Sequence, residues 1–158
     1  MASDRTAQEG LELTELSPET MKRLQAKMPH WARTGNPVDT ERLFETFGSN
    51  TSLMFALDTI VKDANVEMVD FLLVALPQFQ FDLTRTVAEI REKPATAGKP
   101  VAVHTTGMKE LVTKATALLE ENRIPVYPTI ERAASSLAVT CGYACCRCAQ
   151  PNAFELSN

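Results

Sequence analysis

The residues best placed to do chemistry are a histidine and the three residues after it, His104, Thr105, Thr106 and Gly107. His104 ends a predicted strand, so its ring and the threonine hydroxyls could meet a ligand where the strand gives way to a helix. No serine or cysteine stands at a spacing that would make it a nucleophile for this histidine. The alternative is a structural histidine at the edge of the core, with its ring hydrogen-bonded to the backbone, and we favour this interpretation.

A second polar group lies in residues 35–39, Gly-Asn-Pro-Val-Asp, just before an amphipathic run. Asn-Pro followed by aspartate is ordinary chemistry for a turn and a helix start, with Asp39 capping a short helix over residues 40–47. We therefore expect a structural role for Asn36 and Asp39, with ligand contact as the alternative. Trp31, in the loop before them, is expected to cover a sheet edge or a domain contact.

All four cysteines crowd into the carboxyl-terminal part of the chain, at Cys141, Cys145, Cys146 and Cys148. Thiolates four residues apart share a helix face, and tetrahedral zinc needs four such ligands. The spacing fits no paired C-x-x-C ribbon, however, and adjacent cysteines point apart on a helix. Free thiols are the favoured interpretation, and we expect no bound metal and no disulfide framework.

The elements that must position these residues alternate between strands and helices. Three apolar runs predict strands, at residues 70–76, 100–104 and 124–127. Apolar residues at helical spacing predict helices that start at Ser17-Pro18 and that cover residues 53–61, 83–90, 108–119 and 130–137. The lysines, proline and glycine of residues 93–99 indicate an exposed loop. This alternation predicts an α/β domain with a parallel sheet flanked by helices.

Composition narrows the class of protein. A chain of 158 residues with 44% hydrophobic and 23% charged residues predicts one packed domain. The formal net charge of -4 gives no positive field for a nucleic acid. The longest apolar run, residues 71–77, is far shorter than a membrane span, and the amino terminus lacks the layout of a signal peptide. We expect a cytoplasmic protein.

Several phrases, in the same order, are similar to the second flavodoxin-like domain of the NDP-forming acyl-CoA synthetases, relatives of succinyl-CoA synthetase. They cover most of residues 1–140, which we assign to this domain, with residues 141–158 as a cysteine-rich helix end and tail. The phrases are GLEL with LSPET (residues 10–20), MP (28–29), NPVD (36–39), the strand at 69–76, KPVAV (99–103) and IPVYPTIERA (124–133).

The resemblance implies an enzyme that couples ATP to acyl-CoA through an acyl phosphate and a phosphohistidine carried by another domain. Neither His30 nor His104 stands in the context of that histidine, and the chain has no ATP-grasp module. The resemblance therefore implies that this chain is a domain or subunit that is inactive alone and binds no cofactor. The complete enzyme uses CoA and ATP or ADP. The partners of this chain are the CoA-binding phosphohistidine domain and the ATP-grasp domain, in a homo- or hetero-oligomer. A stand-alone binding or regulatory module that lost the chemistry is the alternative.

In such a fold, ligands bind at the carboxyl ends of the strands. The candidates for this edge are Asn36, Asp39, Gln78, Gln80, His104, Thr105, Thr106 and Gly107. In the family, the helix after the 70–76 strand can point its amino terminus at the phosphohistidine. Here Phe79, Phe81 and Asp82 disfavour a phosphate, so we favour a closed packing turn.

The resemblance also implies a missing element. Domains of this family begin with a central strand and a glycine-rich turn that this sequence lacks. An upstream segment, a partner or the amino terminus is expected to fill the gap, and the exposed strand edge favours dimerisation.

Overall fold

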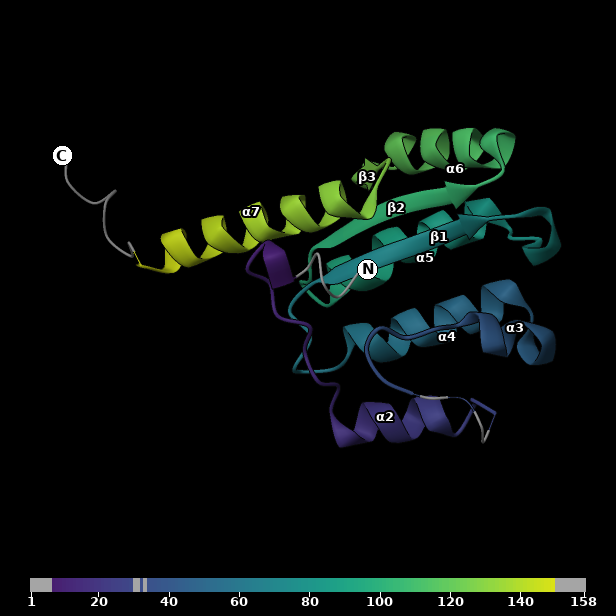
Figure 1. The fold of residues 1–158 in the computed structure, drawn as a ribbon, viewed down its shortest axis with the longest axis horizontal. Helices are drawn as coiled ribbons and strands as arrows, with labels where there is room; N and C mark the ends of the chain where they lie inside the picture. Colours follow the sequence, from purple (N-terminus) through teal and green to yellow (C-terminus); the bar gives the residue numbers. More distant parts are fainter. Residues whose placement is uncertain (1–6, 30–31, 33, 150–158) are drawn as a thin grey trace.

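A computed structural model describes residues 7–29, 32 and 34–149 of the chain (Figure 1). Its elements follow in the order α2 (Pro18–Gln25), α3 (Glu41–Phe47), α4 (Ser49–Val61), β1 (Val69–Ala75), the 3-10 turn η1 (Pro77–Phe79), α5 (Leu83–Thr96), β2 (Val101–Gly107), α6 (Lys109–Glu121), β3 (Val126–Tyr127) and α7 (Ile130–Ala149). His30 and Trp31 lie outside the described residues, so the expected role of Trp31 stays a prediction.

The three strands form one parallel sheet in the order β1-β2-β3. Val69 pairs with Val101 and Ala75 with Gly107, so β1 and β2 are in contact over their whole length. Helices α5 and α6 provide the crossovers that parallel strands require. Both strands therefore end at the same edge, and the predicted α/β fold with a parallel sheet is confirmed.

The main core lies between one face of the sheet and the helices α4 and α5. Phe71 and Leu73 of β1 pack there with Leu57 of α4 and Ile90 of α5. Because successive strand residues point to opposite faces, Ala102 faces the other side. There it is buried with Ala133 and Leu137 of α7, and Figure 1 shows α7 continuing well past the sheet.

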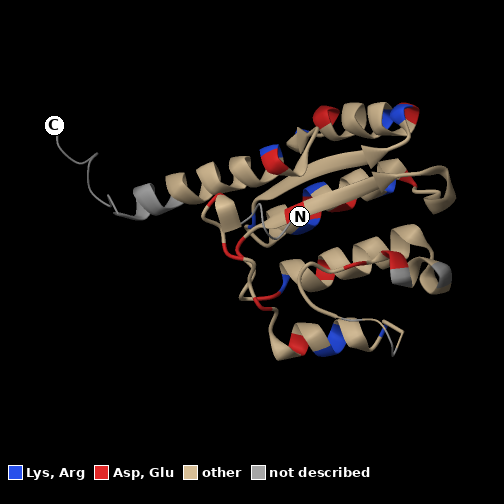
Figure 2. Cartoon of the chain, viewed as in Figure 1, with Lys and Arg blue, Asp and Glu red and all other residues tan. Residues whose placement is uncertain are grey.

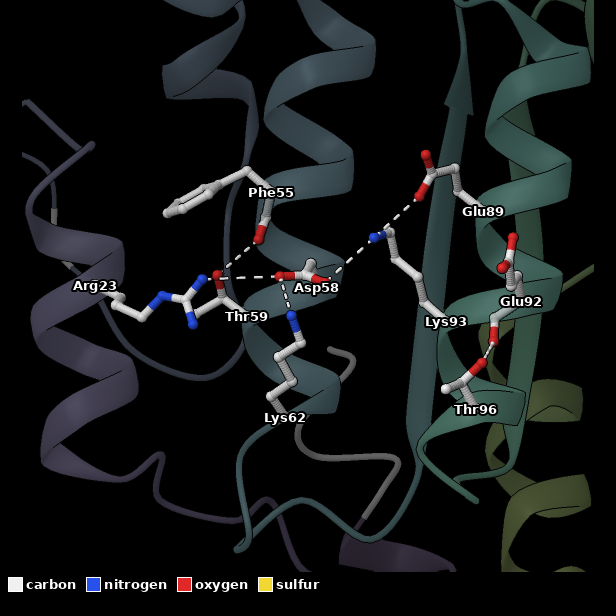
Figure 3. Close-up of polar contacts among 9 residues, drawn as sticks. All are labelled: Arg23, Phe55, Asp58, Thr59, Lys62, Glu89, Glu92, Lys93 and Thr96. Carbon is white, nitrogen blue, oxygen red and sulfur yellow. Dashed lines mark hydrogen bonds and ion pairs between the residues drawn. The ribbon is translucent and has the colours of Figure 1, made fainter.

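A cluster of ion pairs joins three helices around Asp58 of α4 (Figure 3). Its carboxylate lies 3.7 Å from Arg23 of α2, 2.8 Å from Lys62 and 3.2 Å from Lys93 of α5. Lys93 also pairs with Glu89 at 3.1 Å. These contacts hold α2, α4 and α5 in register beside the core.

Two boundaries differ from the sequence predictions. The loop predicted over residues 93–99 is wrong, because α5 runs to Thr96 with Pro94 buried inside it. The ion pair of Lys93 with Asp58 of α4 holds that last turn, and the chain turns only at Gly98, with φ of +67°. The strand expected to end at His104 continues to Gly107, because its pairing with β1 extends that far.

The first third of the chain joins the domain through buried apolar side chains, such as Leu16 and Leu24, and through polar contacts, but not through a strand in the described residues. Within the described residues no strand precedes β1, which therefore forms one edge of the sheet. Ser17 caps α2 as predicted, since its hydroxyl accepts a hydrogen bond from the Thr20 N–H. In turn the Ser17 N–H donates to the buried carboxylate of Asp63 at 2.8 Å.

Charged residues of both signs are spread over the described helices. Figure 2 shows basic residues interspersed with acidic ones on the helices, and β2 has no Lys, Arg, Asp or Glu. In the part of the chain that the structure describes, no helix is both long and apolar enough to cross a bilayer.

Candidate functional site

A hollow of about 450 Å³ opens at the edge of the sheet where the strands end. The turn after β1 forms one side of it and the start of α4 the other, and Figure 1 places both at the end where the arrowheads of β1 and β2 point. Its lining residues are Phe44, Gly48, Ser49, Asn50, Thr51, Gln78, Phe79 and Gln80. Of the sequence candidates, Gln78 and Gln80 therefore reach the same hollow.

The start of α4 offers the chemistry of this hollow. Its N-cap is Gly48, with φ of +74°, and no side chain caps the helix. The first helical hydrogen bond runs from the Ser52 N–H to the Gly48 carbonyl at 3.1 Å. The N–H groups of the first turn thus lack a side-chain acceptor, and with the helix dipole they favour an anion.

Sequence reasoning missed this helix start. The predicted helix begins at residue 53, although a glycine and four polar residues, 49–52, directly precede its apolar face. Such a run before helical spacing is itself a signal for an N-terminus. Extending the predicted helix by four residues would have located the start of α4, though not the hollow beside it.

The start of α5, the helix that follows the turn after β1, is closed. Asp82 is the N-cap, and its carboxylate accepts a hydrogen bond from the Arg85 N–H at 3.1 Å. Asn50 of α4 accepts from the Asp82 N–H at 2.8 Å and donates to the Thr86 hydroxyl at 2.8 Å. The protein's own carboxylate fills the position that a bound anion would take.

The phenylalanines of this turn pack on one another. The Phe79 ring lies 5.1 Å from the ring of Phe44 and 5.9 Å from that of Phe81, measured between centroids. The first pair is edge-to-face and the second is tilted, and such contacts between aromatic rings stabilise a compact turn. The choice between a closed packing turn and a phosphate site remains a prediction.

His104 lies inside β2 and not at its end, and its ring nitrogen Nδ1 is 3.1 Å from the Asp70 carboxylate of β1. This corrects the expected bond between the ring and the backbone, because the diagonal neighbour on β1 supplies a better acceptor. The histidine is 8% exposed, on the sheet face that carries Tyr127. It is held within the sheet, away from the residues that line the hollow.

The residues after His104 have separate roles. Thr105 is buried, with its hydroxyl 3.4 Å from that of Thr116 on α6, while Thr106 is exposed. Gly107 pairs with Ala75, and a Cβ atom there would lie 2.2 Å from the Ala75 carbonyl oxygen. Gly107 therefore serves the close approach of β1 and β2.

Asn36 and Asp39 both make hydrogen bonds to backbone groups of the chain. The Asn36 side chain donates to the Thr14 carbonyl at 3.1 Å, which ties the loop to the amino-terminal segment. The Asp39 carboxylate accepts from the Glu41 N–H at 3.0 Å at the start of α3, although the N-cap itself is Thr40. Neither residue lines the hollow.

The cysteines lie on or near the second half of α7. Cys141 is half-buried there, and the side chains of Cys145, Cys146 and Cys148 lie outside the described residues. No group of histidine, cysteine, aspartate or glutamate suited to a metal ion occurs in the part that the structure describes.

Comparison with known proteins shows which proteins this chain is similar to. No protein-family model matches the chain. The ADP-forming acetate–CoA ligase II of Archaeoglobus fulgidus is 26% identical over 142 residues, which are 90% of this chain and 20% of that ligase. A crystal structure from Pyrococcus horikoshii OT3 is 27% identical with a TM-score of 0.71, over 87% of this chain and 31% of that one.

A third similar protein is the dinucleotide-forming acetyl-coenzyme A synthetase 1 of Ca. Korarchaeum cryptofilum. Its apo structure is 22% identical with a TM-score of 0.72, over 98% of this chain and 33% of that one. This chain thus spans a fifth of the curated relative and about a third of each solved chain. It resembles one part of an ADP-forming acetyl-CoA synthetase, as its sequence predicts, and it has the α/β fold of the flavodoxin-like domain of those enzymes.

Proposed function

We propose that this chain is a flavodoxin-like domain or subunit of an ADP-forming acyl-CoA synthetase and carries no phosphorylated histidine of its own. The complete enzyme interconverts an acid, CoA and NTP with an acyl-CoA, NDP and phosphate. The observation that carries the proposal is the 26% identity to an ADP-forming acetate–CoA ligase over 90% of this chain. Because that match is 20% of the ligase, the CoA-binding, phosphohistidine and ATP-grasp parts come from the remainder of the enzyme.

In this proposal the hollow at the carboxyl edge supports the phosphohistidine site of a partner domain. The start of α4 supports this role, because its first turn has no side-chain cap and opens into the hollow. Gln78 and Gln80 add amide donors on the opposite side. The site is completed only when a partner brings the phosphorylated side chain to it, so the chain alone forms no acyl-CoA and holds neither CoA nor nucleotide.

The first experiment is an affinity capture of the tagged chain from its own cell extract, with mass spectrometry of the bound proteins and a test for phosphohistidine. We expect a CoA-binding polypeptide that carries phosphohistidine. The captured complex should form acetyl-CoA from acetate, CoA and ATP, while the purified chain should not. Formation of the thioester by the chain alone would contradict the proposal. We place this reaction in the cytoplasm.

A stand-alone binding or regulatory module is the second candidate. The closed start of α5 favours it, since Asp82 and the three packed phenylalanines leave no room there for a phosphate. In that case the capture recovers only the chain itself, as monomer or homodimer. No ATP-grasp module is then encoded in the same or an adjacent reading frame.

A further inference from the structure

A second hollow, of about 390 Å³, lies at the opposite edge of the sheet, where β2 and β3 begin. The last turns of α5, the turn after α6 and the middle of α7 surround it. In Figure 1 this is the end of the sheet from which the arrows of β1 and β2 start. The two hollows share no lining residue, so they are separate sites.

The charge around this second hollow is of one sign. Arg91 of α5, Lys99 and Arg123 line it, and no aspartate or glutamate does. The Lys99 ammonium donates to the Asp63 carbonyl at 2.5 Å. In the described part of the chain, neither arginine side chain forms an ion pair or a hydrogen bond. Two guanidinium groups therefore have their N–H donors available for an anion.

Arg123 occupies a backbone position that favours glycine. Helix α6 ends in a Schellman motif, in which the Arg123 N–H donates to the Glu120 carbonyl at 2.9 Å. The next N–H, that of Ile124, donates to the Leu119 carbonyl at 3.0 Å. Arg123 is left-handed, with φ of +59°, which costs stability for any residue that has a Cβ atom. A costly residue beside a hollow indicates a role for its side chain beyond the fold.

The rest of the lining is largely apolar. Pro100, Ile124 and Leu137 contribute to it, and the last two are buried. The volume lies within the range of about 300–1,000 Å³ that is usual for small-molecule sites. An inorganic anion alone would leave this apolar surface in contact with water. A matching ligand therefore combines a charged group with an apolar body.

We propose that this hollow binds a small organic anion. Its charged group is held by Arg91 and Arg123, and its apolar body packs on Ile124 and Leu137. The charged group is a carboxylate or a phosphate ester, because a guanidinium pairs with either through two parallel N–H···O bonds. The site is independent of the proposed function, since it lies at the far end of the strands from the hollow beside α4.

The test is a titration of the full chain with three probes that share one apolar body: naphthoate, naphthyl phosphate and uncharged naphthol. Backbone amide shifts in NMR spectra locate the binding. We expect both anions to shift Ala95, Asn122 and Thr140, which line this hollow, and to bind about tenfold more tightly than naphthol. The anion that binds more tightly identifies the ligand as a carboxylic acid or a phosphate ester. Equal affinity for naphthol, shifts at Asn50 and Gln80 of the other hollow instead, or no shifts at all would overturn the proposal.

Arg123→Gly separates binding from folding. It should weaken the binding of both anions by about tenfold, and it should not lower the melting temperature, because glycine suits the left-handed position. Arg91→Gln should weaken binding to a similar extent. Arg85→Gln is the matched control, since Arg85 is exposed at the start of the same helix and lines neither hollow.

Unchanged affinity in the Arg123→Gly variant, or an equal loss in the Arg85→Gln variant, would overturn the assignment of the charged group to this hollow. The titration uses the chain alone. Its result therefore does not depend on the outcome of the affinity capture, and the two proposals can fail separately.

Discussion

Asp63 holds the amino-terminal segment by hydrogen bonds, beside the buried side chains of Leu16 and Leu24. It is 2% exposed, and its carboxylate accepts hydrogen bonds from the backbone N–H groups of Ser17 and Asn65 at 2.8 and 2.9 Å. Burial acts to raise the pKa of Asp63, but these hydrogen bonds outweigh it, and the pKa lies below its ordinary 3.8. The aspartate is therefore charged and fully partnered at neutral pH.

We expect Asp63→Ala to lower the free energy of unfolding by about 2 kcal/mol, because buried N–H donors lose a charged acceptor. Urea unfolding at neutral pH measures this. Glu67→Ala is the control, since Glu67 is exposed four residues away and should change the free energy by less than about 0.5 kcal/mol. An equal effect of the two variants would show that the contact with Ser17 contributes nothing.

Gly107 is the one glycine whose Cβ atom would collide with backbone. The collision is at 2.2 Å from the Ala75 carbonyl oxygen, and φ at Gly107 is +130°. Gly107→Ala should destabilise the chain by about 3 kcal/mol, through overpacking together with backbone strain. Gly142→Ala is the control, because that helical glycine has open space around it and should gain about 0.5 kcal/mol or more. Thermal unfolding of both variants distinguishes them.

At the scale of elements, the sequence predicts the middle of each helix and strand better than its ends. Apolar spacing finds α4, α5 and α6 and the three strands, since burial imposes that spacing directly. The ends depend on contacts between distant residues. Pro94 stays inside α5 because its neighbour Lys93 pairs with Asp58, 35 residues away in the chain, and β2 reaches Gly107 because β1 is there to pair with it.

The candidate site shows the same limit. The structure shows that Asp82 and Thr129 each accept a hydrogen bond from a backbone N–H at the start of a helix. The hollow is not recognisable from sequence alone, because it forms where the start of α4 meets the turn after β1, and nothing local in either segment specifies that meeting. His104, the most suggestive residue in the sequence, instead belongs to a cross-strand pair with Asp70.

The start of α4 can be tested as an anion site in the assembled enzyme. Ser49→Glu places a carboxylate in the first turn of α4, where it suits the helix dipole but competes with a phosphoryl group for the N–H donors. We expect acyl-CoA formation to fall by about tenfold or more with no loss of thermal stability. Lys109→Glu is the matched control at the first position of α6 and should leave the rate unchanged. A fall in both would point to general surface charge.

The whole molecule is held together by a hydrophobic core and by charged contacts between its helices. Hydrogen bonding from Lys62 and the charge of Lys93 lower the pKa of Asp58 against the opposing effect of burial. Burial acts to lower the pKa of Lys93, but Glu89 and Asp58 outweigh it and raise the pKa above its ordinary 10.5. Asp58 therefore contributes stability that is lost at acid pH, and Lys93 contributes stability that is lost at alkaline pH.

Asp58 and Asp63 both have a pKa below 3.8 in the folded chain. The stability that these two carboxylates contribute is complete above their pKa in the unfolded chain, and it is lost as the pH falls through their pKa in the folded chain. The stability that Lys93 contributes is lost as the pH rises through its folded-state pKa, which lies above 10.5. The urea midpoint should thus stay level between about pH 5 and pH 9 and fall below about pH 4. The double variant with Asp58→Asn and Asp63→Asn should have a lower urea midpoint at neutral pH and a smaller fall of the midpoint at acid pH. Glu67→Gln should change neither. If the midpoint of the double variant fell as much at acid pH as that of the unchanged chain, other carboxylates would set the acid limit of the fold.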